Sequence, residues 1–339
     1  MERVNKDGFI VNTTDKIYIF DTIRVVAMTA IVISHFMEYT IGGTMVGELG
    51  RYLGGCGVVV FFLLSALLFG LRWEATEKLP FPIGKFMKKR IIRIGCPLWV
   101  YLIGVVLLFV ASGVPVPWID FGLNLCFLGY LGRLPGNPHL WFVTVIMLCY
   151  LEFVILSKYK INVILGTILL VLSLVGYYIF QSKGLPGHIF LTLGMCGLMF
   201  CFARNFMDFV VKIPHKIILG GAFWGLNIYA IWLFENNLFD THRLVAFPLY
   251  RICGLSWMIL MIWMLPNRRI GMINYLSTIS FEIYIVHQML CRGPLLTVDM
   301  ISGSRTIQFV SLLVISFILA VILHFVSNKL MDLLLRVAR

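Results

Sequence analysis

Charged residues are scarce in this chain. Asp, Glu, Lys and Arg together make up 13% of its 339 residues, whereas apolar residues make up 60%. The mean hydropathy is +0.93. Soluble globular domains carry about 25% charged residues, so this composition excludes an ordinary soluble enzyme. Acidic residues are the scarcer kind, with 16 Asp and Glu against 28 Lys and Arg.

Motifs for metal or redox chemistry are also missing. The eight cysteines are scattered without a C-x-x-C pair, and no H-E-x-x-H motif occurs. Most of the cysteines lie in apolar runs, where cysteine behaves as a small core residue. We therefore expect no metal cofactor. The chain has no low-complexity tail or long polar linker, so we expect one transmembrane domain over residues 1–339 with no appended soluble domain.

Long apolar runs account for most of the sequence. Because about 20 apolar residues in a helix cross a hydrocarbon core of roughly 30 Å, these runs predict an all-α, polytopic bundle of about ten transmembrane helices. The expected spans are residues 18–37, 56–71, 94–112, 139–157, 162–180, 188–204, 216–234, 244–265, 271–291 and 306–328. A further stretch, 121–131, is too short to cross. We expect a multi-pass protein of the cell membrane, plasma or inner, in contact with membrane lipids.

Lysine and arginine are unevenly distributed among the loops. They gather in alternate loops, at residues 3–16, 72–93, 158–160, 204–216, 268–269 and 329–339. Since basic residues accumulate on the cytoplasmic side of membrane proteins, this pattern predicts that both termini are cytoplasmic and that the number of crossings is even. The net charge of +12 is then explained by the basic residues of the cytoplasmic loops, and we expect no nucleic-acid partner.

The first span holds ionisable residues, which are costly in lipid. Arg24 and His35 have ten residues between them, so on a helix they share one face about 17 Å apart along the axis. Such residues indicate a functional site by default. Two structural alternatives stay open: Asp21 and Arg24 pair or reach the interface, and His35 is a neutral, hydrogen-bonded residue. Glu38 is the nearest candidate to orient the His35 ring.

A basic cluster precedes the third span. Lys89, Arg90 and Arg93 belong to the segment KFMKKRIIRIGCP. Any such cluster beside a span can anchor the chain to anionic lipid. The two arginines, three residues apart, also present adjacent guanidinium groups suited to the phosphate oxygens of a cytoplasmic donor. The sequence leaves both interpretations open.

Polar residues also mark the later spans. His139 and Trp141 stand at the outer end of 139–157, where tryptophan is typical of the membrane interface. Arg251 and Glu282 are expected to pair, because buried opposite charges in membranes commonly do so. One face of 271–291 carries Ser277, Ser280, Tyr284 and His287. This stripe either lines a cavity or forms interhelical hydrogen bonds.

The order of these motifs resembles the acyltransferase 3 family of membrane-bound O-acyltransferases, which move acetyl or similar groups onto sugars, peptidoglycan or other envelope polymers. The motifs are D-x-x-R followed by ten residues and His (from Asp21), G-x-x-x-F-F-x-x-S (from Gly57), R-x-x-R-I-x-x-P (from Arg90), HLWF (from His139) and S-x-E-I-Y-x-x-H (from Ser280). The chain departs at Ala66, where the family usually has Gly, and at residues 145–147, where many members carry a glutamate.

The resemblance implies an integral membrane O-acyltransferase that carries an acyl group, acetyl above all, from acyl-CoA to a hydroxyl of an envelope glycan or lipid-linked saccharide. It implies these roles: His35 as general base with Arg24 and Glu38 as further catalytic residues, Arg90, Arg93 and Lys89 for CoA, and His139, Trp141, Tyr284 and His287 for the acceptor. An oligomer is compatible with it. Two alternatives stay open, a polysaccharide exporter of similar span count and a non-catalytic partner of a polymer synthase.

Overall fold

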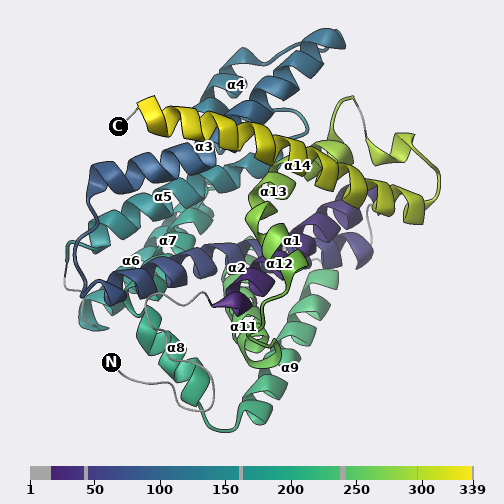
Figure 1. The fold of residues 1–339 in the computed structure, drawn as a ribbon. Coiled ribbons are helices and arrows are strands. Elements are labelled where there is room, and N and C mark those ends of the chain that lie inside the picture. Colours follow the sequence, from purple (N-terminus) through teal and green to yellow (C-terminus); the bar gives the residue numbers. More distant parts are fainter. Residues whose placement is uncertain (1–16, 42–44, 160–162, 237–241, 296, 338–339) are drawn as a thin grey trace. The chain divides into compact units, whose positions relative to one another are not determined.

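The fold is entirely helical. The computed structural model describes residues 17–41, 45–159, 163–236, 242–295 and 297–337 (Figure 1). Helix makes up 82% of the structure, and no strand occurs within these ranges. The expected all-α fold is therefore confirmed. Some of the residues used to predict orientation lie outside the described ranges, namely Arg3, Lys6, Lys16, Lys160 and Arg339.

Short connections join most of the helices. Those of the first part of the chain are α1 (Tyr18–Phe36), α2 (Met45–Ala75), α3 (Ile83–Ala111), α4 (Trp118–Leu125), α5 (Trp141–Leu156), α6 (Val163–Ser182) and α7 (His188–Cys201). Those of the second part are α8 (Ala203–Lys212), α9 (Lys216–Glu235), α11 (Arg243–Met264), α12 (Gly271–Thr278), α13 (Ser280–Arg292) and α14 (Arg305–Val337). The single-turn elements are the π-helical η1 (Met37–Ile41) and the 3-10 turns η2 (Pro138–Leu140) and η3 (Val298–Met300).

Several helices are long and apolar enough to cross a membrane. Within the described residues there are seven, or eight if the bent pair α7 and α8 is one span. The expected span 271–291 is instead two helices, α12 and α13, interrupted at Ile279. In α6 the described apolar part, Gly166–Ser182, is shorter than the other spans. The chain is therefore a multi-pass membrane protein, and the count of ten crossings stays a prediction.

The expected span 188–204 bends sharply. Helices α7 and α8 meet at 78°. The charged residues of α8, Arg204, Asp208 and Lys212, recur every four residues and share one face of the helix. A helix with one charged and one apolar face lies along a membrane interface more favourably than it crosses the hydrocarbon. The charge pattern of α8 thus explains why the apolar run ends at the bend.

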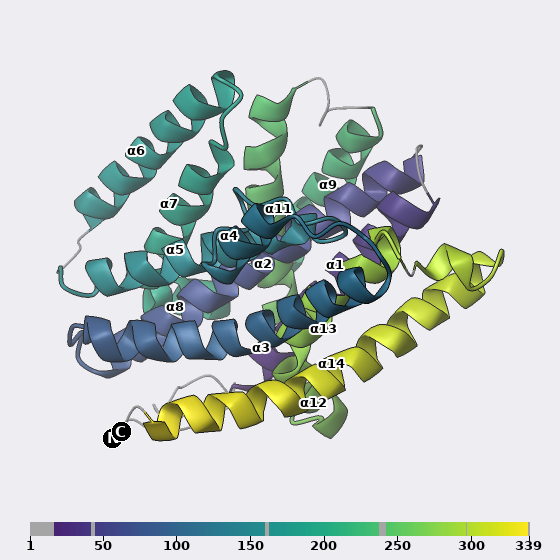
Figure 2. The ribbon, with the colours of Figure 1, turned by 90° about the horizontal axis from the view of Figure 1, so that it is seen from above.

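The chain folds into two compact units whose segments alternate along the sequence. The first unit comprises Met1–Ala27, Gly55–Phe81 and Glu152–Ser277, and the second comprises Met28–Gly54, Pro82–Leu151 and Thr278–Arg339. In the first unit α6 packs along α7, and α11 packs against α9 (Figure 2). In the second unit α14 packs against α3 and α13 (Figures 1 and 2). The expectation of a single domain over residues 1–339 stays a prediction.

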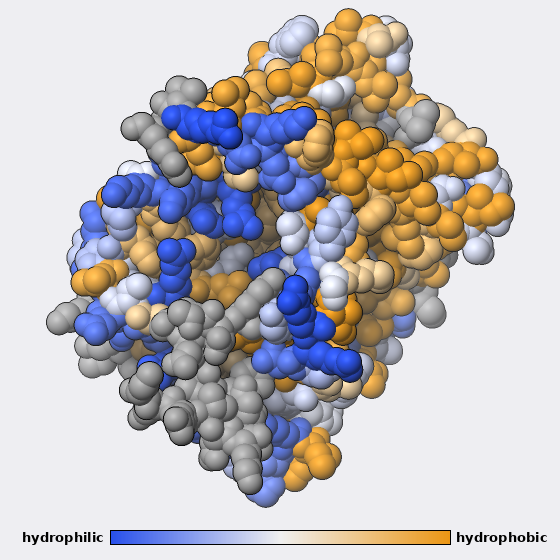
Figure 3. Space-filling view, viewed as in Figure 1, coloured by the Kyte–Doolittle hydropathy of each residue, from blue (hydrophilic) through white to orange (hydrophobic). Residues whose placement is uncertain are grey.

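Helix α14 shows how the apolar residues divide between core and surface. It buries Leu312 and Ala320 and exposes Ile318, Ile322 and Phe325. Broad areas of exposed hydrophobic residues are visible on the face shown in Figure 3. Apolar patches of that extent on a water-soluble monomer are rare, and in a membrane protein they face lipid tails.

Glycine permits a close contact between α2 and α11 in the first unit. A Cβ atom added to Gly55 would overlap the ring of Tyr250 in α11. We expect Gly55→Ala to destabilise the protein by about 1–3 kcal/mol, because the added methyl group forces the ring aside. The measurement is the midpoint of thermal unfolding in detergent. Gly225→Ala in α9 is the control, since nothing lies within 4 Å of its Cβ position. Equal losses from the two variants would contradict this assignment.

The predicted orientation can be tested in the turns between helices. Lys78 lies in the turn after α2, and Gly184 lies in the turn after α6. With a cytoplasmic N-terminus, a protease site inserted after Lys78 is shielded in intact cells, whereas one inserted after Gly184 is cut from outside. Cleavage of both sites can be followed by immunoblotting. The reverse pattern would show that the orientation predicted from the basic residues is wrong.

Candidate functional site

Three histidines from distant parts of the chain meet in the second unit. His35 lies in the last turn of α1, His139 lies in η2, and His287 lies in the middle of α13. The ring centroids are 4.9 Å apart for His35 and His287, 5.5 Å for His139 and His287, and 6.2 Å for His35 and His139. The structure thus brings the histidine of the first span together with two residues that the sequence placed in other motifs. We call these three residues the histidine cluster.

A hydrogen bond joins two of the rings. Nδ1 of His35 lies 2.7 Å from Nε2 of His287. The rings are inclined by only 7° with centroids 4.9 Å apart. So short a nitrogen–nitrogen distance at that centroid separation requires the rings to lie edge to edge in nearly one plane, and excludes face-to-face stacking. The bond is therefore directed along a nitrogen lone pair.

The partners of the two rings determine their tautomers. Nδ1 of His287 lies 3.2 Å from the carbonyl oxygen of Ile283, which can only accept, so this nitrogen carries the proton. In a neutral ring Nε2 of His287 is then the acceptor, and Nδ1 of His35 donates to it. The same rule leaves Nε2 of His35 without a proton. His35 therefore presents a basic nitrogen on the side of the ring away from His287.

The two rings differ in accessibility. His287 is completely buried, with 0% exposure, whereas His35 is half-buried. Nε2 of His35 has no hydrogen-bond partner within the described part of the chain. An imidazole with one nitrogen anchored and the other free and partly accessible has the arrangement of a general base.

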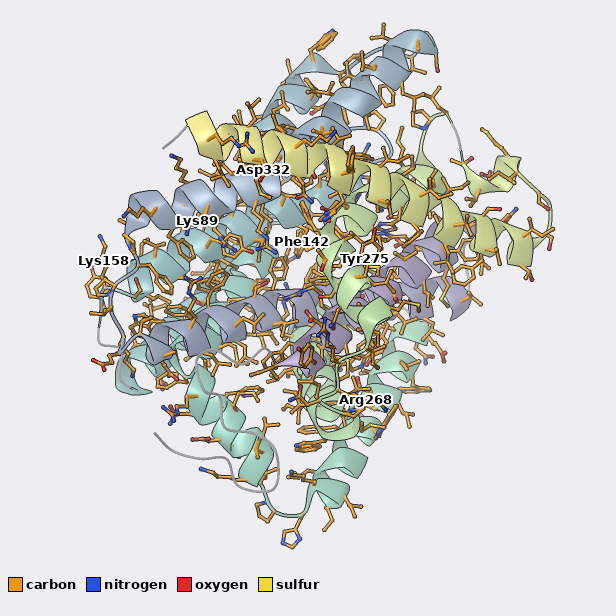
Figure 4. The ribbon with its side chains drawn as sticks, viewed as in Figure 1. Lys89, Phe142, Lys158, Arg268, Tyr275 and Asp332 are labelled. Atoms are coloured by element: carbon orange, nitrogen blue, oxygen red, sulfur yellow. The ribbon has the colours of Figure 1, made fainter. Side chains whose placement is uncertain are left out.

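His139 is held on the other side of the cluster by α13. Its backbone N–H donates to Oε1 of Gln288 at 2.9 Å, and its carbonyl accepts from the Tyr284 hydroxyl at 2.8 Å. Nε2 lies 3.2 Å from the carbonyl oxygen of Ile285, so Nε2 carries the proton and Nδ1 is an acceptor. Phe142, labelled in Figure 4, packs on the Tyr284 ring at 5.0 Å. Sequence reasoning missed Gln288, although it directly follows His287.

Charged residues surround the end of α1 beyond His35. Glu38 lies in η1, and its carboxylate is 3.6 Å from Arg51, which also pairs with Glu48 at 2.7 Å. The Tyr39 ring lies 5.7 Å from the His35 ring and has the Arg292 guanidinium over it at 4.9 Å. The structure thus places Glu38 against Arg51, and places His287 where we expected Glu38 to orient His35.

Arg24 belongs to the first unit. It pairs with Asp21 at 3.3 Å and donates to the Ser277 hydroxyl at 2.7 Å, and Ser277 donates to Asp21 at 2.8 Å. The pair between Asp21 and Arg24 that the spacing allowed is therefore present. Arg24 and Asp21 neutralise each other, and Ser277 holds both. The serine stripe of 271–291 serves here as a hydrogen-bond partner.

Arg251 and Glu282, which we expected to pair, each have other partners inside their own unit. Arg251 donates to the Thr192 hydroxyl at 2.7 Å and to the His188 carbonyl at 3.2 Å. Glu282 pairs with Nδ1 of His324 at 2.7 Å. His324 lies on α14 and was not singled out from the sequence, since a lone histidine in a long apolar run carries no motif.

The basic cluster forms the first turns of α3 in the second unit. Lys89 and Arg93 are exposed (Lys89 is labelled in Figure 4), whereas Arg90 is half-buried with its guanidinium 5.7 Å from the rings of Phe86 and of Tyr150. The N-terminus of a helix carries partial positive charge and unpaired N–H groups, which add to the attraction for anions. The start of α3 is therefore a candidate phosphate-binding surface.

The remaining expected site residue, Trp141, begins α5 two residues after His139.

A metal role for the histidine cluster receives no support. Across the described residues no group of three or more His, Cys, Asp or Glu side chains could hold a metal ion. Two of the ring nitrogens are already committed to the bond between His35 and His287.

Comparisons with known proteins agree with the motifs. A family model described as an acyltransferase domain, that of the acyltransferase 3 family, matches residues 17–325. No curated protein and no solved structure gave a significant match. The matched residues include the whole histidine cluster and the basic turns of α3, and they cover nearly the whole chain. The chain therefore belongs to the acyltransferase 3 family of membrane acyltransferases.

Proposed function

We propose that this protein is an O-acyltransferase of the cell membrane that carries an acyl group, acetyl by preference, from cytoplasmic acyl-CoA to a hydroxyl of an envelope carbohydrate. Family membership supports acyl transfer. The observation that supports His35 as the base is its hydrogen bond to His287, because this bond leaves a free basic nitrogen on a half-buried ring.

The reaction we propose at His35 is direct transfer. As the acceptor oxygen bonds to the thioester carbonyl carbon, Nε2 of His35 takes the hydroxyl proton. The tetrahedral intermediate then collapses, the carbon–sulfur bond breaks, and the same proton passes from His35 to the CoA sulfur. The products are an ester and a free thiol, and His35 returns to its starting state.

We propose His287 as the positioning residue. It fixes the tautomer and the direction of the His35 ring, as a hydrogen-bonded carboxylate does in other acyl-transfer enzymes. When His35 gains its second proton, the bond to His287 becomes charge-assisted and therefore stronger. This interaction is then greater in the transition state than in the ground state, which is the condition for accelerating the chemical step.

The other expected residues keep their proposed roles. His139, Trp141 and Tyr284 would form the acceptor side, since His139 and Tyr284 pack at the histidine cluster. Glu38, which we expected to orient the His35 ring, pairs with Arg51 and stays a proposed catalytic residue in η1, three residues after His35. Arg24 would act on the donor or on developing negative charge, and Asp21 and Ser277 would set its orientation.

We propose that the start of α3 binds the phosphates of CoA. Arg90 and Arg93 supply two guanidinium groups one helical turn apart, and Lys89 adds a third positive charge. Guanidinium groups bind phosphate oxygens through paired hydrogen bonds, which a lipid anchor does not require. The thioester would then reach the histidine cluster through the length of the pantetheine arm.

Substitution of the two hydrogen-bonded histidines tests the proposed base. We expect His35→Ala to lower kcat for acyl transfer about 10²- to 10⁴-fold, the usual contribution of a general base. We expect His287→Leu to lower kcat about tenfold, because one hydrogen bond of about 1.4 kcal/mol is lost. His287→Gln should recover most of the loss, since its amide oxygen can accept the same bond. The assay is transfer from radiolabelled acetyl-CoA in membranes matched for protein abundance.

Two results would contradict the assignment. Near-normal transfer by His35→Ala would remove His35 as the base. Equal losses from His287→Leu and His287→Gln would show that His287 fills space and does not orient the ring.

Neutralising the start of α3 tests donor binding. We expect Arg90→Gln combined with Arg93→Gln to raise KM for acetyl-CoA about tenfold or more, because charge-assisted bonds to phosphate contribute about 1.5–3 kcal/mol each. KM for the acceptor should change little. Lys158→Gln, which removes an exposed positive charge at the end of α5, is the matched control. Equal changes in both KM values, or an equal effect of the control, would favour a lipid anchor.

A further inference from the structure

His139 has a hydrogen-bond acceptor that the protein leaves unused. Its Nε2–H donates to Ile285, so Nδ1 carries a lone pair. Nδ1 is fully buried and has no hydrogen-bond partner in the described residues. The residue as a whole is 3% exposed. A buried polar atom without a partner costs about 1–3 kcal/mol, so its retention calls for a partner that is absent from the folded chain alone.

Three nearby donors are engaged elsewhere. The Tyr284 hydroxyl donates to the carbonyl oxygen of His139. His35 donates through Nδ1 to His287. His287 donates through Nδ1 to the carbonyl oxygen of Ile283. No side chain of the histidine cluster therefore has a proton left for Nδ1 of His139.

The two unused nitrogens of the cluster share a chemical character, because each is a hydrogen-bond acceptor. One nitrogen of each ring is hydrogen-bonded to a residue of α13. The partner is Ile285 for His139 and His287 for His35. Because the two nitrogens of an imidazole point to opposite sides of the ring, the free nitrogen of each ring is directed away from its α13 partner. The ring centroids are 6.2 Å apart. Two hydroxyls on adjacent carbons, each forming a hydrogen bond of about 2.8 Å, can reach two rings whose centroids are this far apart.

We propose that Nδ1 of His139 accepts a hydrogen bond from a second hydroxyl of the acyl acceptor, next to the hydroxyl that His35 deprotonates. The acceptor is then a sugar residue with two hydroxyls on adjacent carbons, and His139 selects which hydroxyl receives the acyl group. This inference rests on the proposed function and narrows its substrate class. A site built to bind a hydroxyl discriminates strongly against a substrate that lacks it, because the buried acceptor is then left without a partner.

Two substitutions separate this role from a structural one. His139→Asn keeps an amide oxygen where Nδ1 lies and loses the group that bonds to Ile285. His139→Gln keeps an amide N–H where Nε2 lies and loses the acceptor. If Nδ1 binds substrate, the Asn variant retains more activity. If the only role of His139 is its hydrogen bond to α13, the Gln variant retains more activity than the Asn variant.

The test uses the full-length protein in its own cells, with and without the gene and with each variant at equal abundance. Mass spectrometry and NMR of the envelope glycans locate the ester and measure its amount. We expect the ester on a hydroxyl whose neighbouring carbon bears a free hydroxyl, and at least about tenfold more of it with His139→Asn than with His139→Gln, the effect of one hydrogen bond.

Each other outcome is decisive. No gene-dependent ester on any envelope glycan would overturn the proposed function itself. An ester confined to a hydroxyl without a hydroxyl neighbour would overturn only the role of His139. Equal activity of the two variants, or more activity with His139→Gln, would also overturn it. A raised KM for acetyl-CoA in membranes of the His139→Gln variant, with ester position unchanged, would assign Nδ1 to the donor and contradict the proposal.

Discussion

The bond between Nδ1 of His35 and Nε2 of His287 is the interaction on which the site depends. It joins the end of α1 to α13, and through Ile283 it assigns a proton to one nitrogen of each ring. Without it, the His35 ring could turn about its side-chain bonds, and its basic nitrogen would have no fixed direction. A neutral partner also avoids placing a carboxylate beside the imidazole inside a membrane, where an unpaired charge is costly.

The bilayer imposes the same requirement on every other polar group inside the helices. Several ionisable side chains find partners within their own unit, as Arg24 does with Asp21 and as Glu282 does with His324. His324 is held in turn by Asn328, one helical turn further along α14. Such networks hold helices together where lipid supplies no hydrophobic driving force. Nδ1 of His139 is one of several buried polar atoms that have no hydrogen-bond partner in the described residues.

Much of the fold could be predicted from the sequence, because the hydrocarbon core demands long apolar helices and little else. The apolar runs located the long spans. The run of residues 188–204 ends at the bend between α7 and α8, where the charged residues of α8 begin. The interruption at Ile279 was not evident, because it involves no proline or glycine. The partners of Arg251 and Glu282 were not predicted for the same reason, since hydropathy says how deep a residue lies and nothing about which helix faces it.

By itself the sequence determined that this is a helical membrane protein and, through the spacing from Asp21 to His35 and the later motifs, that it belongs to the acyltransferase 3 family. The tertiary structure alone decided which residues complete the site. The hydrogen bond from His35 spans 252 positions of the chain. A local sequence pattern indicates which residues share one face of a helix. The proton acceptor for His35 depends instead on how α1 packs against α13, and this packing depends on all the side chains between the two helices.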